Sequence, residues 1–552
     1  MHSALFVDGL PPGAPRTSDL EPYSRFRMEQ GRLSMRTLAD LIKYSARYYP
    51  DTLSTIYKDT RLTYRELNRR ADMLANGLLK EGVGKGDRVG IICHTSHFFQ
   101  EIFFGIVKSG GVAVTVNWRL SPRETEFVLN DADVSVLFIA ERFWGNIDAI
   151  LSRLPKIRRI IVIGNDVHGA VGYEAFLRAS SDNEASVDLA PEDPVWLLYT
   201  SGTTGKPKGV LLTHRSILAD AEHNIIGNRL NRDNVVWLHA LPMFHIAGKL
   251  IFTAAYVHGT MVFMDRFDLK ELCETIEKER CSYLLGAPQM WQWIMDYPEL
   301  DKYDLSSLRF GTYSTAPMPM VTIKRLKEKF PDITFFSTYG LTEAGSSLTI
   351  LPADQHITEG PDHLRKRLGS LGRPMYGVDV RILDDNGRDC PPGVVGEIVG
   401  RGDNIMKGYW NLPEETSNTV RDGWLFTGDM GYWDEYGYIY MTDRKKDLII
   451  SGGENIAPKE VENVIREIEG VVDVAVIGVP DDKWGEIVKA VVIKGPDSEL
   501  SEDDVIRYCA ENIASYKKPR SVVFTSAFPR SPVGKVLKKD LRVKYGNKEV
   551  SD

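Results

Sequence analysis

The stretch DRVGIICHTSHFFQEIFFGIVKSGGVAVTVN, residues 87–117, contains two apolar segments with a longer segment of helical character between them. Its apolar ends, 88–94 and 111–117, have the length and composition of buried strands. The middle part, 97–110, predicts a helix that closes at Gly110. A strand, a helix and a second strand in this order indicate two parallel strands joined by a crossover helix.

The same alternation continues toward the C-terminus. VSVLFIA (134–140) and RRIIVIG (158–164) predict further strands, whereas ETEFVLNDA (124–132) and NIDAILSRL (146–154) predict helices. On the N-terminal side, residues 35–80 predict a hairpin with a helix at each end. Strands that are apolar throughout are typical of a largely parallel sheet that is covered on both faces.

The pattern changes twice in the second half of the chain. Residues 369–445 contain short strands separated by Gly, Asp and Pro turns, which indicates a small β unit. The segment that follows alternates helices and strands, and Ser501 and Asp504 occupy capping-box positions at one helix start. We therefore expect an α/β fold: a large N-terminal domain of stacked α/β sheets over 1–444, which includes the β unit, and a small C-terminal α+β domain over 446–552.

Composition excludes several classes of protein. The 552 residues are 43% hydrophobic and carry a formal net charge of −8, so a disordered chain and charge-driven nucleic-acid binding are both disfavoured. The five cysteines are an odd number without a CxxC pair, which disfavours a disulfide framework or a cysteine-based zinc site. No secretory signal, lipidation signal or apolar run of spanning length is visible. We expect a soluble cytoplasmic protein without an integral membrane segment.

The most informative local motif is YTSGTTGKPKG, residues 199–209, which follows the apolar strand DPVWLLY. Its glycines permit close backbone approach, its hydroxyls are hydrogen-bond donors, and its lysines add positive charge. These features suit a polyphosphate. The spacing is not that of a Walker A motif, and the alternative for such a loop is a flexible surface segment.

A second motif, YGLTE at 339–343, follows the apolar run ITFF and should lie at the carboxyl end of a strand, where ligands bind in open α/β sheets. An aromatic ring can stack on a base, a hydroxyl can contact phosphate, and a carboxylate can hold Mg²⁺. Taken alone, the motif is equally compatible with a turn that leads into a helix.

Together these motifs resemble the adenylate-forming enzymes, the superfamily of acyl- and aryl-CoA synthetases, peptide adenylation domains and beetle luciferases. Further matching segments occur in family order from about residue 35 to 540: LPMFHIAG (241–248), TYGLTEAG (338–345), GSLGRPMYGVDVRI (369–382), GYW (408–410), TGD (427–429), DRKKDLIISGGENIAPKEVE (443–462) and PRSPVGK (529–535). The resemblance implies ATP, Mg²⁺ and coenzyme A as co-substrates and cofactor, and homodimers are common among similar enzymes.

The resemblance also implies roles for individual residues. The catalytic residues would be Lys535, Thr342, Glu343 and His245, and Glu343 and Thr204 would bind the metal. ATP and AMP would be held by Thr200, Ser201, Gly202, Thr203, Thr204, Gly205, Lys208, Thr315, Ala316, Ser337, Thr338, Tyr339, Gly340, Asp429 and Arg444. A cation such as Lys535, placed between carboxylate and α-phosphate, would stabilise charge in the transition state.

The acyl and CoA sites follow in the same way. The acyl pocket would contain Phe244, His245, Gly248, Met290 and Gly311. CoA would be bound by Arg266, Ser451, Gly452, Gly453 and Asn455, and Lys446 would be the hinge of the small domain. Amino-acid-activating relatives usually have Asp where this chain has His245, which argues against an α-amino acid substrate.

We expect an ATP-dependent carboxylate–CoA ligase that acts on a hydrophobic fatty, aromatic or cyclic acid. One alternative is an adenylating enzyme with another acceptor, either a carrier-protein thiol or oxygen. The other is a catalytically inactive nucleotide-binding regulator, which retention of Lys535, Glu343, Asp429 and Arg444 disfavours.

Overall fold

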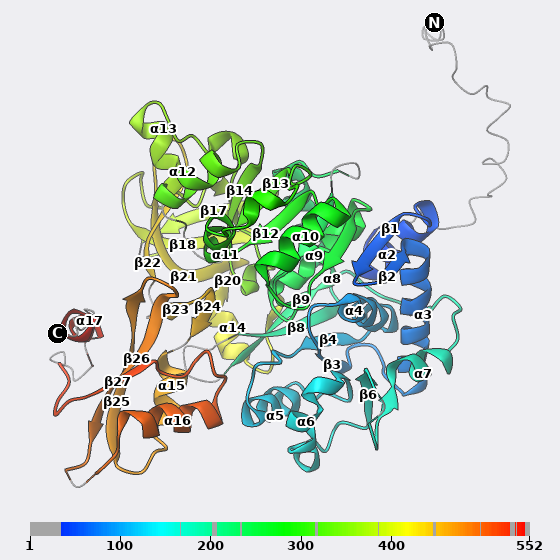
Figure 1. The fold of residues 1–552 in the computed structure, drawn as a ribbon, viewed down its shortest axis with the longest axis horizontal. Helices are drawn as coiled ribbons and strands as arrows, with labels where there is room; N and C mark the ends of the chain where they lie inside the picture. Colours follow the sequence, from blue (N-terminus) through cyan, green and yellow to red (C-terminus); the bar gives the residue numbers. More distant parts are fainter. Residues whose placement is uncertain are drawn as a thin grey trace, which may run out of the picture. The chain divides into compact units, whose positions relative to one another are not determined.

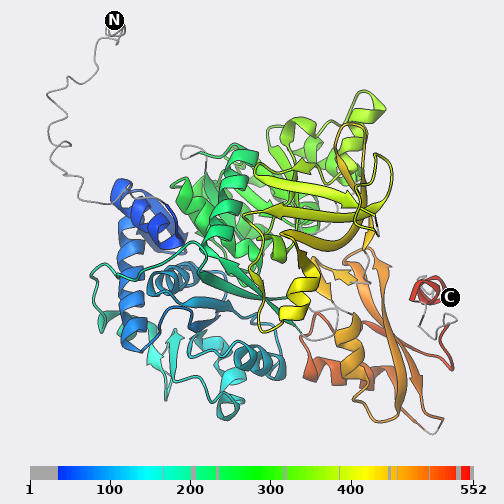
Figure 2. The same ribbon diagram turned by 180° about the vertical axis from the view of Figure 1, so that it is seen from behind.

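The computed structural model describes residues 35–165, 167–200, 207–231, 235–314, 318, 320–384, 386–444, 449–456, 458–496, 498–529, 536 and 538–546. The fold reported below belongs to one compact unit, Arg36–Asp552. Figures 1 and 2 show its elements from opposite sides.

The first sheet has eight strands in the order β19-β9-β8-β4-β3-β5-β6-β7. The six strands from β8 to β7 are parallel to their neighbours, and only β9 and β19 are antiparallel. The prediction of a largely parallel sheet is therefore confirmed. Its elements are β3 (Arg88–Ile92), α4 (His97–Ser109), β4 (Val112–Thr115), α5 (Pro122–Asp131), β5 (Val136–Ala140), α6 (Trp144–Asp148), β6 (Arg159–Ile163), β7 (Val171–Gly172), α7 (Tyr173–Arg178), β8 (Pro194–Thr200), β9 (Lys208–Thr213), α8 (His214–Asn228) and β19 (Gly408–Tyr409).

The second sheet has nine strands in the order β16-β15-β14-β13-β12-β10-β11-β1-β2, parallel from β14 to β1. The N-terminal hairpin between two helices is confirmed, and it pairs with this sheet through β1. Its elements are α2 (Leu38–Tyr48), β1 (Leu53–Tyr57), β2 (Thr60–Thr63), α3 (Tyr64–Lys80), β10 (Val236–His239), α9 (Leu250–Tyr256), β11 (Thr260–Phe263), α10 (Leu269–Glu279), β12 (Tyr283–Gly286), α11 (Pro288–Met295), β13 (Phe310–Tyr313), α12 (Met320–Lys329), β14 (Thr334–Tyr339), β15 (Thr349–Leu351), α13 (Asp362–Lys366) and β16 (Arg373–Pro374).

Two smaller sheets follow. The predicted β unit is an antiparallel sheet of β17 (Val378–Leu383), β18 (Gly396–Gly402), β20 (Val420–Arg421), β21 (Trp424–Trp433) and β22 (Ile439–Arg444), with α14 (Pro413–Thr419) beside it. Figure 2 shows, in orange, two helices beside the C-terminal sheet. Apolar side chains of the sheet and of both helices form one buried core. The elements of this part are β23 (Ile449–Ser451), β24 (Glu454–Ile456), α15 (Pro458–Ile465), β25 (Val471–Asp481), β26 (Gly485–Lys494), α16 (Glu502–Asn512), β27 (Ser521–Phe524) and α17 (Lys538–Tyr545).

Helix boundaries follow local chemistry. Gly110 ends α4 with a φ of 79°, a left-handed conformation that glycine adopts without strain. Ser121 caps α5 and Glu124 completes its capping box, and Ser501 and Asp504 do the same for α16. The prediction at Ser501 is confirmed.

The helix expected over residues 146–154 is wrong in its extent. Regular α-helix covers only Trp144–Asp148, and a separate 3₁₀ turn covers Leu151–Arg153. Ile147, Ile150 and Leu154 are nevertheless buried. The apolar spacing therefore reflects the burial of these three side chains. Two short turns bury them as well as one continuous helix would.

No helix in the described ranges is long and apolar enough to cross a membrane. All five cysteines are buried and are free thiols.

The crossing of α3 and α4 depends on a glycine. A methyl group added at Gly105 of α4 would lie 2.4 Å from Cβ of Leu74 on α3. Both residues are buried, so neither can move into solvent. The two helices can therefore approach this closely only because position 105 has no side chain.

We expect Gly105→Ala to lower stability by about 1–3 kcal/mol, because the added methyl overpacks the contact between the helices. The control is Gly145→Ala, also on a helix but exposed, with no atom within 4 Å of the added methyl. The midpoint of thermal unfolding measures both. An unchanged midpoint for Gly105→Ala would contradict this account of the crossing.

Candidate active site

Two residues predicted to bind the nucleotide meet at the carboxyl end of β14. The hydroxyl of Tyr339 donates a hydrogen bond of 2.8 Å to Oδ2 of Asp429, which lies on β21. Asp429 is 8% exposed. Its backbone lies opposite that of Arg444 on β22, so all three positions are close together. The bond orients a buried carboxylate that is able to accept hydrogen bonds from ribose hydroxyls.

The turn after β14 depends on Gly340. A Cβ at this position would lie 1.7 Å from the carbonyl oxygen of Ser346, so no other residue fits. The turn leads into a short 3₁₀ helix that contains Thr342 and Glu343. Ser337 and Thr338 precede it on β14, where both are half-buried.

Glu343, the predicted metal ligand, is held by a neighbouring tyrosine. The hydroxyl of Tyr409 donates a 2.8 Å hydrogen bond to Oε1 of Glu343, and burial and the nearby carboxylate raise the pKa of that hydroxyl. The carboxylate is chemically suited to Mg²⁺, which prefers oxygen ligands. Glu343 would thus contribute one ligand, with its orientation set by Tyr409.

Lys208 has partners that the sequence did not predict. Its ammonium forms an ion pair with Glu415 of α14 and lies 5.2 Å from the ring centroid of Tyr409. Lys208 is 9% exposed. Thr200 ends β8, and its hydroxyl lies 3.5 Å from the carbonyl of Lys208. The role of Lys208 at phosphate stays a prediction.

Several predicted residues lie outside the described residues. They come from the predicted phosphate loop, the predicted adenine-binding segment, the predicted hinge and the predicted catalytic lysine. These residues are Ser201, Gly202, Thr203, Thr204, Gly205, Thr315, Ala316, Lys446 and Lys535. Arg444 and Asn455 are described for their backbone only.

A second group of polar residues joins the C-terminal segment, the part of the chain from β23 onward, to the predicted acyl pocket. Nε2 of His245 lies 3.2 Å from Oε2 of Glu454, which is on β24, and Arg119 contacts the other oxygen of Glu454 at 2.7 Å. Burial opposes the charge on Glu454, but the adjacent His245 and Arg119 outweigh it and hold the pKa of Glu454 at about 2. The carboxylate is therefore ionised at neutral pH and is able to orient the imidazole.

The other predicted pocket residues differ in their surroundings. Phe244 is buried, and its ring centroid lies 4.4 Å from that of His245. A Cβ at Gly248 would lie 2.4 Å from the carbonyl oxygen of Met243, and one at Gly311 would lie 2.6 Å from the ring of Phe335. Close packing thus explains both glycines without a ligand.

Met290 belongs to the buried core of the second sheet. Its part in an acyl pocket, like that of Gly248 and Gly311, stays a prediction.

The predicted CoA residues lie in two places. Ser451 is the last residue of β23, and Gly452 begins the turn to β24, where its backbone N–H donates to the carbonyl of Trp484 at 2.8 Å. Gly452 and Gly453 have φ values of 59° and 84°, which favour glycine. Arg266 is exposed, beyond the end of β11.

Sequence reasoning missed Arg119 and Glu454. Glu454 lies within SGGEN, between residues predicted to bind CoA, but nothing in the motif indicates that its partner is His245. Arg119 follows β4 and packs between the rings of Trp118, Phe244 and Tyr516, with ring-centroid distances of 5.3–5.4 Å. A charged residue just beyond a buried parallel strand is the one sequence signal that could have drawn attention to it.

Comparisons with known proteins identify the family to which the chain is similar. Residues 42–410 match the family described as AMP-binding enzyme, and residues 460–535 match the AMP-binding enzyme C-terminal domain. A feruloyl-CoA synthase of an Amycolatopsis species is 36% identical over 91% of this chain and 97% of that protein. A long-chain-fatty-acid–CoA ligase of Mycobacterium tuberculosis is 38% identical over 88% of this chain and 94% of that protein.

Solved structures are similar along nearly the whole chain. The amide bond synthetase McbA from Marinactinospora thermotolerans has a TM-score of 0.84 at 26% identity, covering 93% of this chain and 100% of that one. A double mutant of o-succinylbenzoate CoA synthetase from Bacillus subtilis, bound with its product analogue OSB-NCoA, has a TM-score of 0.80 at 28% identity, with 91% and 98% covered. An anthranilate CoA ligase in complex with anthranoyl-AMP has 0.69 at 27% identity, with 92% and 97% covered.

We expect Tyr409→Phe to raise about tenfold the Mg²⁺ concentration that gives half-maximal pyrophosphate release from ATP, because Glu343 loses the hydrogen bond that orients it. Titrating Mg²⁺ at saturating ATP measures this. Tyr436→Phe, at an exposed tyrosine on the β21–β22 hairpin, is the control. If both variants keep the wild-type Mg²⁺ dependence, Tyr409 does not position a metal ligand.

Proposed function

Because the chain belongs to the AMP-binding enzyme family, we propose that it is an ATP-dependent, AMP-forming carboxylate–CoA ligase. Relatives over nine-tenths of the chain include acid–CoA ligases, and one is a fatty acid–acyl-carrier-protein ligase of Streptomyces coeruleorubidus. ATP, Mg²⁺ and CoA are the co-substrates and cofactor of such a reaction. The observation that carries the proposal is the full-length relationship, combined with a site in which Tyr339, Asp429 and Glu343 gather at one sheet edge.

In the first half-reaction, a carboxylate oxygen of the acid attacks the α-phosphorus of ATP. The bond from that phosphorus to the bridging oxygen breaks, and acyl-AMP and pyrophosphate form. Asp429 would accept hydrogen bonds from the ribose, and the ring of Tyr339 would stack on the base. Lys535 would stabilise the negative charge that develops at the α-phosphate, and bound Mg²⁺ would neutralise phosphate charge.

In the second half-reaction, the CoA sulfur attacks the acyl carbon. The bond from that carbon to the phosphate oxygen breaks, AMP leaves, and the thiol proton is released. The described orientation of the C-terminal segment suits this step, because Glu454 reaches His245 at the predicted acyl site.

The structural comparisons support this assignment of the orientation. Two CoA ligases of nearly equal identity and coverage differ in TM-score: 0.80 for the one bound to a CoA product analogue, and 0.69 for the one bound to an acyl-AMP. We infer that a difference in the placement of the small domain underlies this gap in TM-score. The present arrangement is therefore assigned to the thioester-forming step.

The acid is proposed to be hydrophobic. The relatives are named for activity on aromatic, fatty and cyclic acids. The buried Phe244 beside His245 fits an apolar group next to the carboxylate and provides no counter-charge for a substrate ammonium.

The domain division, cellular location and oligomeric state are further proposals. A hinge at Lys446, between an N-terminal domain 1–444 and a C-terminal domain 446–552, is supported by the separate family matches that end at 410 and begin at 460. A cytoplasmic location is supported by five free buried thiols. The homodimer expected from the resemblance stays a prediction, which sedimentation analysis tests.

We expect purified protein with ATP, Mg²⁺ and a mixed carboxylate library to give acyl-CoA products only when CoA is added. Mass spectrometry of the products, with and without CoA, identifies both the acid class and the acceptor. Acyl-AMP that accumulates and does not react with CoA would support the first half-reaction and overturn CoA as the acceptor. Absence of both products would favour a nucleotide-binding regulator.

We expect Lys535→Ala to lower pyrophosphate release by about 10²–10³-fold, since one charged donor to a developing oxyanion is lost. ATP binding should change little. A single-turnover assay measures the rate of pyrophosphate release, and calorimetric titration measures the affinity for ATP. Lys544→Ala, on α17, is the matched control. Wild-type pyrophosphate release by Lys535→Ala would contradict the mechanism.

A further inference from the structure

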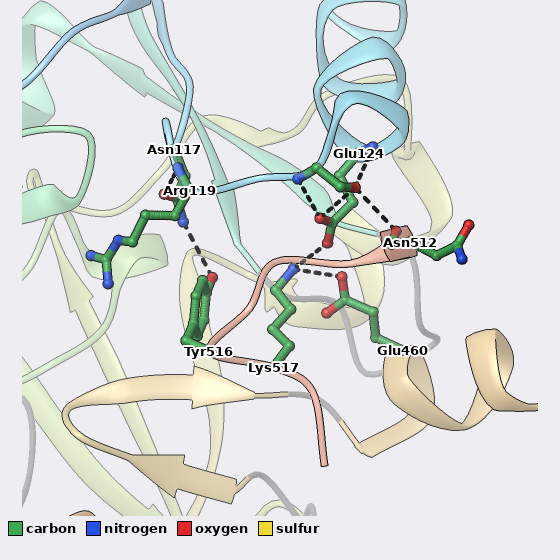
Figure 3. A network of polar contacts seen from close by, with 8 residues as sticks. Asn117, Arg119, Glu124, Glu460, Asn512, Tyr516 and Lys517 are labelled. Carbon is green, nitrogen blue, oxygen red and sulfur yellow. Dashed lines mark hydrogen bonds and ion pairs between the residues drawn. The ribbon is translucent and has the colours of Figure 1, made fainter. Parts of the chain in front are cut away.

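A buried ammonium joins the C-terminal segment to the first sheet. Nζ of Lys517 lies 2.7 Å from Oε1 of Glu460, on α15, and 2.9 Å from Oε1 of Glu124, on α5. Figure 3 shows the lysine between the two carboxylates. The side chains of Lys517, Glu460 and Glu124 are 4%, 7% and 10% exposed. Three ionisable groups therefore share a site that is largely closed to water.

Glu124 has two separate tasks in this arrangement. Its Oε2 accepts hydrogen bonds of 2.9 Å from the backbone N–H and the hydroxyl of Ser121, which form the capping box of α5. Its Oε1 is left for Lys517. The hydroxyl of Ser121 lies 3.0 Å from the carbonyl of Asn512 at the end of α16. The first turn of α5 is thus a rigid docking point for the C-terminal segment.

Two neighbouring contacts extend the same interface. Nδ2 of Asn117 lies 3.2 Å from the hydroxyl of Tyr516, the residue before Lys517, as Figure 3 shows. Arg119, two residues after Asn117, bonds to Glu454, which contacts His245. Contacts at the start of α5 and contacts at the predicted acyl site therefore belong to one continuous surface. The flanking pair Arg123–Glu467 is exposed and contributes little.

The charges favour a contact that can open again. A buried cation without a partner is strongly unfavourable, but Lys517 keeps Glu460, on its own side of the interface, when Glu124 is withdrawn. Glu124 then returns to water, where its ionised form is well solvated. Docking must remove that water, so the gain from the new ion pair is partly offset.

The ammonium stays charged in the docked state. Burial opposes its charge, but Glu460 and then Glu124 outweigh burial and raise the pKa of Lys517. The two carboxylates therefore favour the charged form of Lys517 in the docked state.

We propose that Lys517, docked on Glu124, is a positioning residue for thioester formation: it holds the C-terminal segment in the orientation that brings Glu454 to His245. This inference rests on the proposed function. It assigns Lys517 and Glu124 a task in the second half-reaction only, since neither belongs to the group formed by Tyr339, Asp429 and Glu343.

The test is Glu124→Gln, which removes the charge but keeps an amide oxygen for the capping box. Single-turnover conversion of preformed acyl-AMP to acyl-CoA should slow about tenfold or more, as expected for loss of a hydrogen bond between charged groups. Pyrophosphate release in the absence of CoA should stay within about twofold of wild type, which also demonstrates that the variant folds.

The matched control is Glu66→Gln. Glu66 completes the same kind of capping box on α3, bonding to Thr63 at 2.8 and 2.9 Å, but it faces solvent away from the C-terminal segment. Both half-reactions should keep wild-type rates. Equal slowing by Glu66→Gln and Glu124→Gln would mean that the capping box, and not the contact with Lys517, is responsible.

A second variant tests the same interface without altering a charge. Tyr516→Phe removes the hydroxyl that contacts Asn117 but keeps the ring beside Arg119. It should slow thioester formation about threefold and leave pyrophosphate release unchanged.

The outcomes separate this inference from the proposed function. Wild-type protein that forms acyl-CoA, with Glu124→Gln equally fast in both steps, overturns the role of Lys517 alone. Slowing of both half-reactions to the same extent also overturns it. Wild-type protein that forms acyl-AMP but never acyl-CoA overturns the proposed acceptor and the positioning role together.

Discussion

Buried backbone groups must be hydrogen-bonded, and this constraint decides where the site can form. Inside two largely parallel sheets every strand is committed to its neighbours and to an apolar covering. Polar side chains can gather only where strands end. Tyr339 is the last residue of β14 and Glu343 lies in the 3₁₀ turn just after it, and strand β21 brings Asp429 to Tyr339. The predicted nucleotide site therefore lies at the end of the strands, where the sheet leaves polar side chains free to gather.

Close backbone contacts at this edge explain why glycine recurs in the motifs. At Gly340 a side chain would collide with the carbonyl of Ser346, and at Gly345 it would lie 2.5 Å from the carbonyl of Asn404. The second contact brings the turn after β14 against the segment that contains Asn404 and leads to Tyr409. The motif thus encodes a fold of the backbone first, and the placement of Glu343 follows from it.

The sequence predicted those parts whose cause is local. Strand and helix order, the hairpin between α2 and α3, the end of α4 at Gly110 and the capping box at Ser501 all depend on nearby residues. The helix over 146–154 was overestimated because apolar spacing records burial and does not record whether the turns are continuous. The partners Glu415 of Lys208 and Phe335 of Gly311 come from other elements and leave no local pattern.

Contacts between distant segments need a different kind of argument, because they can exist in one orientation and be absent in another. No sequence pattern predicts the contact of His245 with Glu454 or that of Lys517 with Glu124. The contacts within each segment differ from the contact between the segments. Lys517 keeps its ion pair with Glu460 inside the C-terminal segment, and Glu124 keeps its hydrogen bonds in the capping box of α5. Only the contact between Lys517 and Glu124 is lost when the segments separate. Because Lys517 and Glu124 each keep a partner on their own side, the interface opens without leaving a buried charge unpaired. An enzyme that must form an anhydride in one arrangement and consume it in another requires this property of its interface.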